Sequence, residues 1–205
     1  MAKINHVATG AWRGQISGLA QKAIDDAAAI GRELEARLNR IENDRTRNPL
    51  EKLPMRQKAA QDAKQHLERT MALAYRFGVE RAEEAQKARA RDLVPTSDNL
   101  SAMTLAAHLM NKSPAEIKKL VQVDPRFALA ANFYPPEVFG MKRDEHSAMM
   151  GKAWETHHPE KFAIEQAAIQ ELKALDVLTR SVGDFCKMEI EQCAQGMASA
   201  GRVED

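Results

Sequence analysis

Aromatic residues are scarce in this chain, at 5% of 205 residues, and no stretch alternates β-branched with polar residues as a strand would. Hydrophobic residues still reach 44% of the sequence, much of that alanine, and charged residues reach 29%. A chain rich in alanine and charge but poor in aromatic residues favours long helices that pack closely through small side chains. We therefore expect an all-α fold.

Long apolar runs and a disulfide framework are also missing. No span of about 20 apolar residues exists, so no transmembrane helix is expected, and residues 1–18 lack the apolar core of a signal peptide. Cys186 and Cys193 fall on one predicted helix with their α-carbons about 10 Å apart, beyond disulfide reach. Free thiols that pack as small hydrophobic groups fit a reducing compartment. We expect a cytoplasmic location, or the virion if the chain is of viral origin.

The common catalytic motifs are absent as well. The sequence has no glycine-rich phosphate loop, no Gly-x-Gly-x-x-Gly, no His-Glu-x-x-His, no Cys-x-x-Cys and no Gly-x-Ser-x-Gly. We therefore expect a protein that is not an enzyme and that needs no cofactor. A helical enzyme with a pocket in residues 96–160 stays open as an alternative, because a site can be assembled from distant residues. A pocket that gathers His108, His146 and Glu155 would favour it.

The nearest approach to a metal site is a group of histidines and glutamates near residue 157. Imidazole and carboxylate groups bind zinc and similar ions. However, adjacent histidines on a helix point about 100° apart, and Pro159 interrupts the local geometry. We therefore expect no metal ion and assign these histidines to a helix end, where the helix dipole stabilises positive charge. The group consists of Glu155, His157, His158 and Glu160, with His146 upstream.

A long antiparallel helical hairpin is predicted in residues 15–95. The first helix is expected over residues 15–45, and the second over residues 54–93, where small and apolar residues recur at the helical period of about 3.6. Asn48-Pro49 ends the first helix and Leu53-Pro54 opens the second, since proline is tolerated in a first helical turn. The short connection makes the two helices antiparallel.

A seam of apolar and small residues along the first helix is the predicted protein-interaction surface. Its members alternate by four and three residues, as in a coiled coil, and its alanines allow close approach of a partner helix. The partner is either the second helix of the hairpin or another copy of the chain. Trp12, in a flexible arm of residues 1–14, is a candidate docking group for a neighbouring subunit, with folding back on its own helix as the alternative. The predicted interaction residues are Trp12, Ile16, Ala20, Ala23, Ala27, Ile30 and Leu34.

Residues 96–205 are expected to form a helical domain of short capped helices and one long C-terminal helix. Ser113-Pro114-Ala115-Glu116 is a capping box with proline in the first turn, a strong helix start. Aromatic residues within 127–139 indicate a compact core there. His158-Pro159 precedes the last helix, which is expected to run to about Cys193 with a kink near residues 181–184, where glycine weakens the helix.

One short helix of this domain carries methionines among its apolar residues. Ser97 or Asp98 is expected to cap it. Methionine-rich surfaces adapt to partners, but methionines more often fill a core. We expect the core role for most of the five in the middle of the chain, which are Met103, Met110, Met141, Met149 and Met150. His108, in the same apolar stretch, is expected as a hydrogen-bonded core histidine. The apolar positions of this helix are Leu100, Met103, Ala107 and Met110.

Charge is uneven along the chain. Residues 1–95 carry a net charge of +5 and residues 96–205 a net charge of −4, and such halves can attract each other between subunits. Basic residues cluster at the bend of the hairpin, where they could contact nucleic-acid phosphates. No aromatic residues interleave with them, and nearby acids dilute their charge. The basic tip consists of Arg40, Arg45, Arg47, Lys52, Arg56 and Lys58.

These features together predict a non-enzymatic structural or assembly protein that acts through helix–helix contacts. We expect a homo-oligomer that also contacts other protein subunits, and a virion or phage assembly component is one setting for such a protein. The first alternative is an assembly factor that binds nucleic acid through the basic tip. The sequence does not identify the partner.

Overall fold

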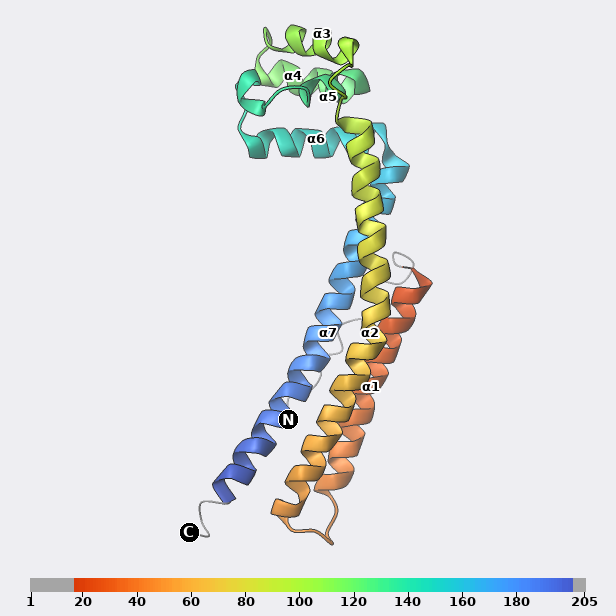
Figure 1. Cartoon of the computed structure of the whole chain (residues 1–205), viewed down its shortest axis with the longest axis vertical. Coiled ribbons are helices and arrows are strands. Elements are labelled where there is room, and N and C mark those ends of the chain that lie inside the picture. Colours follow the sequence, from red (N-terminus) through yellow and green to blue (C-terminus); the bar gives the residue numbers. More distant parts are fainter. Residues whose placement is uncertain (1–16, 201–205) are drawn as a thin grey trace. The chain divides into compact units, whose positions relative to one another are not determined.

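The computed structural model describes residues 17–200 of the chain. Those residues form seven α-helices and one 3-10 helix, with no strand among them, which confirms the all-α prediction (Figure 1). Trp12 and Ile16 lie outside the described residues. The elements are α1 (Gly18–Glu42), α2 (Pro49–Leu93), α3 (Leu100–Leu109), α4 (Pro114–Val123), α5 (Pro125–Ala131), η1 (Pro136–Phe139), α6 (Arg143–His157) and α7 (Pro159–Ala200).

The described residues form two compact units. Unit 1 holds residues 17–79 and 169–200, and unit 2 holds residues 80–168. This grouping differs from the expected division at residue 95. The end of α2 and the start of α7 belong with the short helices, because Leu93 is buried in the core of unit 2 and Phe162 packs against that core. Both long helices therefore contribute to both units.

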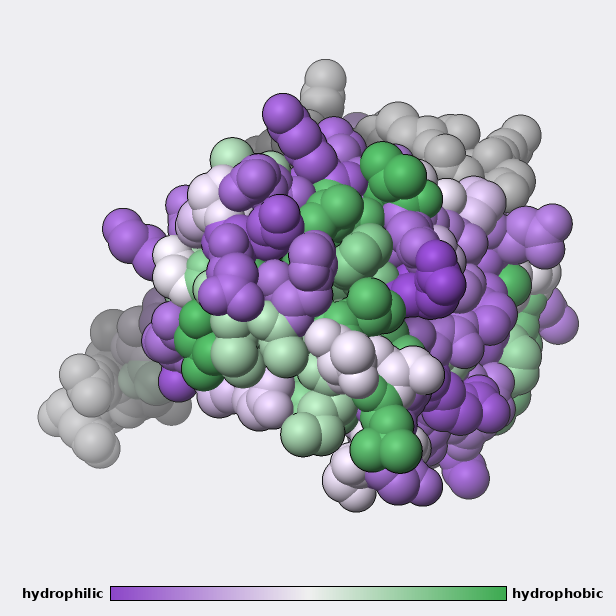
Figure 2. Space-filling view, turned by 90° about the horizontal axis from the view of Figure 1, so that it is seen from above, coloured by the Kyte–Doolittle hydropathy of each residue, from purple (hydrophilic) through white to green (hydrophobic). Residues whose placement is uncertain are grey.

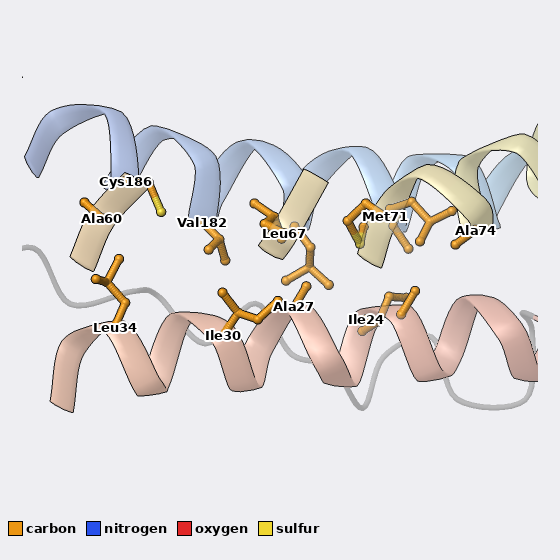
Figure 3. Packing of buried hydrophobic residues seen from close by; sticks show 14 of the residues in the cluster. Ile24, Ala27, Ile30, Leu34, Ala60, Leu67, Met71, Ala74, Val182 and Cys186 are labelled. Carbon is orange, nitrogen blue, oxygen red and sulfur yellow. The ribbon is translucent and has the colours of Figure 1, made fainter. Parts of the chain in front are cut away.

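Unit 1 is a bundle of three helices. Its members are α1, the first part of α2, which runs antiparallel to α1, and the second part of α7 (Figure 1). Ile24, Ile30 and Leu34 of α1 point toward Leu67 and Met71 of α2 (Figure 3). Buried residues recur at three- and four-residue steps, as expected for helices with one apolar face. The third side of this core is formed by Ala174, Leu175, Leu178, Val182 and Cys186 of α7.

Small residues allow these helices to approach closely. Ala20 and Ala27 of α1 and Ala60 of α2 are fully buried, and a methyl side chain at the contact brings helix axes toward the short end of the 8–10 Å range. At Gly78 of α2, an added Cβ would lie 2.9 Å from Cδ2 of Leu172 on α7. The absence of a side chain at Gly78 therefore lets α2 and α7 pack against each other within unit 1.

Two buried carboxylates of α7 hold the other helices of unit 1. Glu171 is fully buried, and its carboxylate accepts hydrogen bonds from the Ser17 backbone N–H and hydroxyl, both at 3.0 Å. Ser17 is also the N-cap of α1, so this contact fixes the start of α1 against α7. Glu189 accepts a hydrogen bond from Arg56 Nη2 of α2 at 2.9 Å. A buried charge is tolerated only with such partners.

The connection between α1 and α2 differs from the sequence prediction. The Asn48 side chain accepts a hydrogen bond from the Glu51 backbone N–H, and the Asn48 N–H donates to the Glu51 carboxylate, both at 2.9 Å. This reciprocal capping satisfies two free amides and starts α2 with Pro49, a residue suited to the first turn. The predicted start at Pro54 is wrong, since Pro54 lies inside α2.

The core of unit 2 is centred on Trp154. This side chain is fully buried, and its ring centroid lies 4.6 Å from that of His158. Phe139 is buried beside it, whereas Phe127 packs at the edge of the cluster. The core expected near residues 127–139 is thus present, although its centre comes from α6.

Capping side chains set the starts of the short helices. Ser113 and Glu116 form the predicted capping box at α4, with Ser113 N–H donating to Glu116 at 2.9 Å. At α3, the cap is Asn99, whose side-chain oxygen accepts from the Ala102 N–H at 3.0 Å. The predicted caps Ser97 and Asp98 are wrong, because the chain makes a further turn before α3 begins.

The last helix is longer than predicted. It continues to Ala200 and is not interrupted at residues 181–184, because Val182 and Cys186 anchor both sides of Gly183 in the core. Despite its 42 residues, α7 carries charged residues throughout. Within the described part of the chain, no helix combines the length and the apolar character needed to cross a membrane.

Replacing Glu171 with alanine tests the buried carboxylate. The change leaves the Ser17 N–H and hydroxyl without their acceptor inside the bundle, and we expect the free energy of unfolding to fall by about 2–4 kcal/mol. Urea denaturation followed by circular dichroism measures this loss. Glu191→Ala is the control, since this exposed residue only pairs with Lys187 at 3.9 Å, and it should cost less than about 0.5 kcal/mol. Equal losses for the two variants would contradict the assigned role.

Candidate protein-interaction surface

Helix α3 is apolar on its exposed side as well as on its buried side. Ala102, Ala106 and Leu109 are buried, and α3 packs against α5. The other side carries Leu100 and Met103, which are 75% and 46% exposed. Ser101, Thr104 and His108 are also exposed, so a polar strip runs beside these apolar residues. Large apolar side chains that stay exposed along one face of a helix point to an interaction site.

We call this exposed side the α3 stripe. Its positions are spaced by three, four and three residues, which places them on one face of the helix. Figure 2, in which the short helices of unit 2 face the viewer, shows apolar residues among hydrophilic ones. Contiguous exposed apolar surface of this kind marks interaction sites in soluble proteins. The α3 stripe consists of Leu100, Met103, Ala107 and Met110.

Most of the five methionines are core residues as expected, since Met141, Met149 and Met150 are buried, whereas Met103 and Met110 are exposed because another face of α3 packs against α5. Both faces of α3 are apolar, so hydrophobic periodicity does not say which one is buried. The buried face carries Ala102 and Ala106 and packs against α5, and Ala106 shares one core cluster with Ala128 and Ala131 of α5. The larger residues are left outside. The sequence signal was the presence of methionines on a short helix without any Asp, Glu, Lys or Arg.

The predicted seam on α1 is used inside the chain. Ala20, Ala23, Ala27, Ile30 and Leu34 are all buried in the core of unit 1, where α2 and α7 cover them. Of the two possibilities left open by the sequence, the structure shows packing within one chain. Trp12 and Ile16 lie outside the described residues, so their predicted role stays a prediction.

The basic tip is partly neutralised by contacts of its own. Lys52 Nζ donates to the Glu42 carbonyl at the end of α1, at 2.6 Å. Arg56 bridges the carboxylates of Glu42 and Glu189 at 3.2 and 2.9 Å. These two cations therefore tie α1, α2 and α7 together, and moving them toward a phosphate would break contacts of the bundle.

The other cations of the tip are exposed. Arg47 pairs with Asp44 at 3.3 Å, and hydrogen bonds from Thr46 hold the pKa of Asp44 below its usual range. Fewer free positive charges are present than the sequence indicates, which weakens a phosphate-binding footprint. Nucleic-acid contact therefore stays a prediction. The tip cations without an ion pair to any described residue are Arg40, Arg45 and Lys58.

Two histidines of unit 2 each form a hydrogen bond with the backbone of a neighbouring helix. His157 Nε2 lies 2.8 Å from the Val121 carbonyl of α4, and His146 Nε2 lies 3.0 Å from the Ala131 carbonyl of α5. Both link α6 to a neighbouring helix, and His158 ends α6. Over residues 17–200, no group of three or more His, Cys, Asp or Glu side chains is arranged to hold a metal ion.

Unit 2 has a cavity of about 390 Å³, which we compare with the pocket expected if the protein were an enzyme. His146 lines it, but His108 and Glu155 do not. His108 is instead exposed on α3, so its predicted core role is wrong. The buried Glu165 at the cavity wall is paired with Arg89 at 3.2 Å. The gathering of residues that would have favoured an enzyme is therefore not found in this cavity.

The two thiols lie in the bundle and do not form a reactive site. Cys186 and Cys193 are both buried. Burial raises the pKa of Cys186 to about 11 and also raises the pKa of Cys193. Since the thiolate is the reactive form, both groups are poor nucleophiles near neutral pH.

Comparison with known proteins gives no relative: the chain matches no protein-family model, no curated protein and no solved structure.

Thiol reactivity checks the packing of α7. In the folded protein at pH 8, we expect dithionitrobenzoate to react with Cys186 at least 100-fold more slowly than with the urea-unfolded chain, because a pKa near 11 leaves few thiolates and burial blocks access. Absorbance at 412 nm follows the reaction, and two thiols should appear after unfolding. Rapid reaction of both thiols in the folded protein would show that the bundle around α7 opens readily.

Proposed function

We propose that this protein is a non-enzymatic assembly protein that works through helix–helix contacts, with the α3 stripe as the surface that meets a partner. The observation that carries the proposal is the exposed apolar side of α3. Leu100, Met103 and Met110 are large, exposed and spaced for contact with one partner helix. This arrangement suits a partner that lays its own apolar face along α3.

The energetics support contact with a protein. Burying a large apolar side chain contributes about 1.5–3 kcal/mol, so the three large residues of the stripe supply a useful fraction of a binding energy. Association itself costs several kcal/mol. One helix of 10 residues offers less than the roughly 800 Å² per partner of a stable interface. The interface therefore extends past α3 or is one contact among several in an assembly.

The composition of the stripe fits an adaptable interface. Methionine is unbranched and polarizable, and it fits partner surfaces of irregular shape. Two of the four stripe residues are methionines, Met103 and Met110. Leu100, at the start of α3, is the most exposed of the three large residues. Self-association is part of the proposal, since a surface of this kind on every copy provides repeated contacts.

Lysine substitutions in the stripe test the proposal. Leu100→Lys combined with Met103→Lys places two charges on the apolar surface, and we expect the affinity of self-association to fall at least tenfold because these charges cannot be buried unpaired. Light scattering behind a sizing column, over a range of protein concentrations, measures the change. The melting temperature should stay within a few degrees of the original, because both side chains are exposed.

Ser101→Lys is the matched control. Ser101 is exposed on the same helix but lies about 100° around it from Leu100. This variant should assemble like the original chain. A chain that is a monomer at high concentration, or a double variant that assembles normally, would overturn the assignment of the α3 stripe to self-association.

A further inference from the structure

A groove between α1 and α7 of unit 1 is a second surface that none of residues 17–200 fills. It has a volume of about 440 Å³ and lies on the side of the bundle toward the α1–α2 connection. Leu38 of α1 and Phe185 and Met188 of α7 form its apolar floor. Phe185 and Met188 are only half-buried. An apolar side chain from another segment would complete their burial.

The polar residues of the groove are mainly acidic. Glu35 and Glu42 line the α1 side and Glu189 lies on the α7 side, with Arg56 as the single cation. Arg56 is already bound between Glu42 and Glu189. Glu35 forms no ion pair with any residue of the described range. The groove therefore carries a net charge of −2 and favours a cationic occupant with a large apolar side chain.

The first 16 residues of the same sequence have this chemistry. They contain Lys3 and Arg13 and no aspartate or glutamate. They also contain Trp12, one of only two tryptophans in the chain. Tryptophan is enriched among the residues that anchor protein interfaces. Segment and groove thus match in charge and in apolar content.

The length of the chain decides which copy provides the segment. Trp12 is five residues before Ser17, so their α-carbons are at most about 18 Å apart. The centre of the groove is farther away, since Leu38 lies about 32 Å along α1 from Ser17. On α7, Glu171 contacts Ser17, and Met188 lies about 26 Å farther along that helix. Trp12 therefore cannot reach the centre of the groove of its own chain.

We propose that the groove between α1 and α7 binds the N-terminal segment of a second copy of this chain, with Trp12 on the apolar floor and Arg13 paired with Glu35. This inference rests on the proposed function as an assembly protein and adds a contact separate from the α3 stripe. Exchange of terminal segments between identical chains is a known route to oligomers.

Photo-cross-linking in the full chain tests the exchange. Trp12 is replaced by p-benzoylphenylalanine, and equal amounts of ¹⁴N- and ¹⁵N-labelled protein are mixed, irradiated and analysed by mass spectrometry. We expect cross-links to residues near Leu38 or Met188, with mixed-isotope pairs forming about half of the cross-linked products. Cross-links confined to one isotope, or none in the groove, would overturn the proposal.

Charge reversal supplies a second test. Glu35→Lys should reduce the cross-link yield at least fivefold, and combining it with Arg13→Glu should restore most of the yield. Glu33→Lys is the matched control, because Glu33 is exposed on the same helix but does not line the groove. Equal cross-link yields for Glu35→Lys and Glu33→Lys would show that Arg13 does not pair with Glu35.

The outcomes separate this inference from the proposed function. A chain that stays monomeric, with no cross-links between copies, defeats both. An oligomer that forms normally without residues 1–16, yet is weakened by the Leu100 and Met103 substitutions, defeats only the exchange. Dissociation of the oligomer when residues 1–16 are removed, together with mixed-isotope cross-links in the full chain, supports the exchange.

Discussion

Buried carboxylates on α7 determine how the long helices lie against each other. An apolar seam made largely of alanine allows neighbouring helices to slide, because a shift by one turn replaces one small residue with another. A charged group inside the bundle does not tolerate such a shift, since it would lose its hydrogen-bond donors. Glu171 on the Ser17 N-cap and Glu189 on Arg56 therefore define the register of unit 1. Glu165 with Arg89 does the same where α7 meets α2 in unit 2.

The same carboxylates explain why the ends of the helices matter as much as their seams. Glu171 binds the first residue before α1, and Arg56 joins α2 to both Glu42 and Glu189. Cations that the sequence would assign to a partner thus complete the bundle itself. The side of α3 and the groove between α1 and α7 are the uncovered surfaces that we propose for contact with a partner.

Much of the fold could be predicted from the sequence. Helical periodicity predicted the seam from Ala20 to Leu34, and the capping box at Ser113 predicted the start of α4. The buried glutamates could not be recognised in the same way, although Glu171 and Glu189 fall in step with Leu175, Leu178, Val182 and Cys186 on one face of α7. A glutamate in such a register is usually exposed, and only its three-dimensional partner shows otherwise.

The surface that we propose for interaction was the least predictable part. The stripe on α3 was visible as an apolar pattern, but a pattern does not say whether the chain covers it. Ala102 and Ala106 are buried because their face of α3 packs against α5, and this depends on how the helices come together in three dimensions. For the seam on α1 the sequence left open whether the partner helix belongs to the same chain, and α2 and α7 of that chain cover Ala20 to Leu34.

The path of the chain has a consequence for how this protein can vary. Unit 2 is a single continuous insert, residues 80–168, placed between two helices of a bundle that is otherwise complete. The two points of insertion are close, since Gly78 lies against Leu172. A short turn in place of residues 80–168 would connect α2 to α7 and leave the order of the helices in unit 1 unchanged. A change in the length of the insert would therefore leave the connection between the helices of unit 1 unchanged.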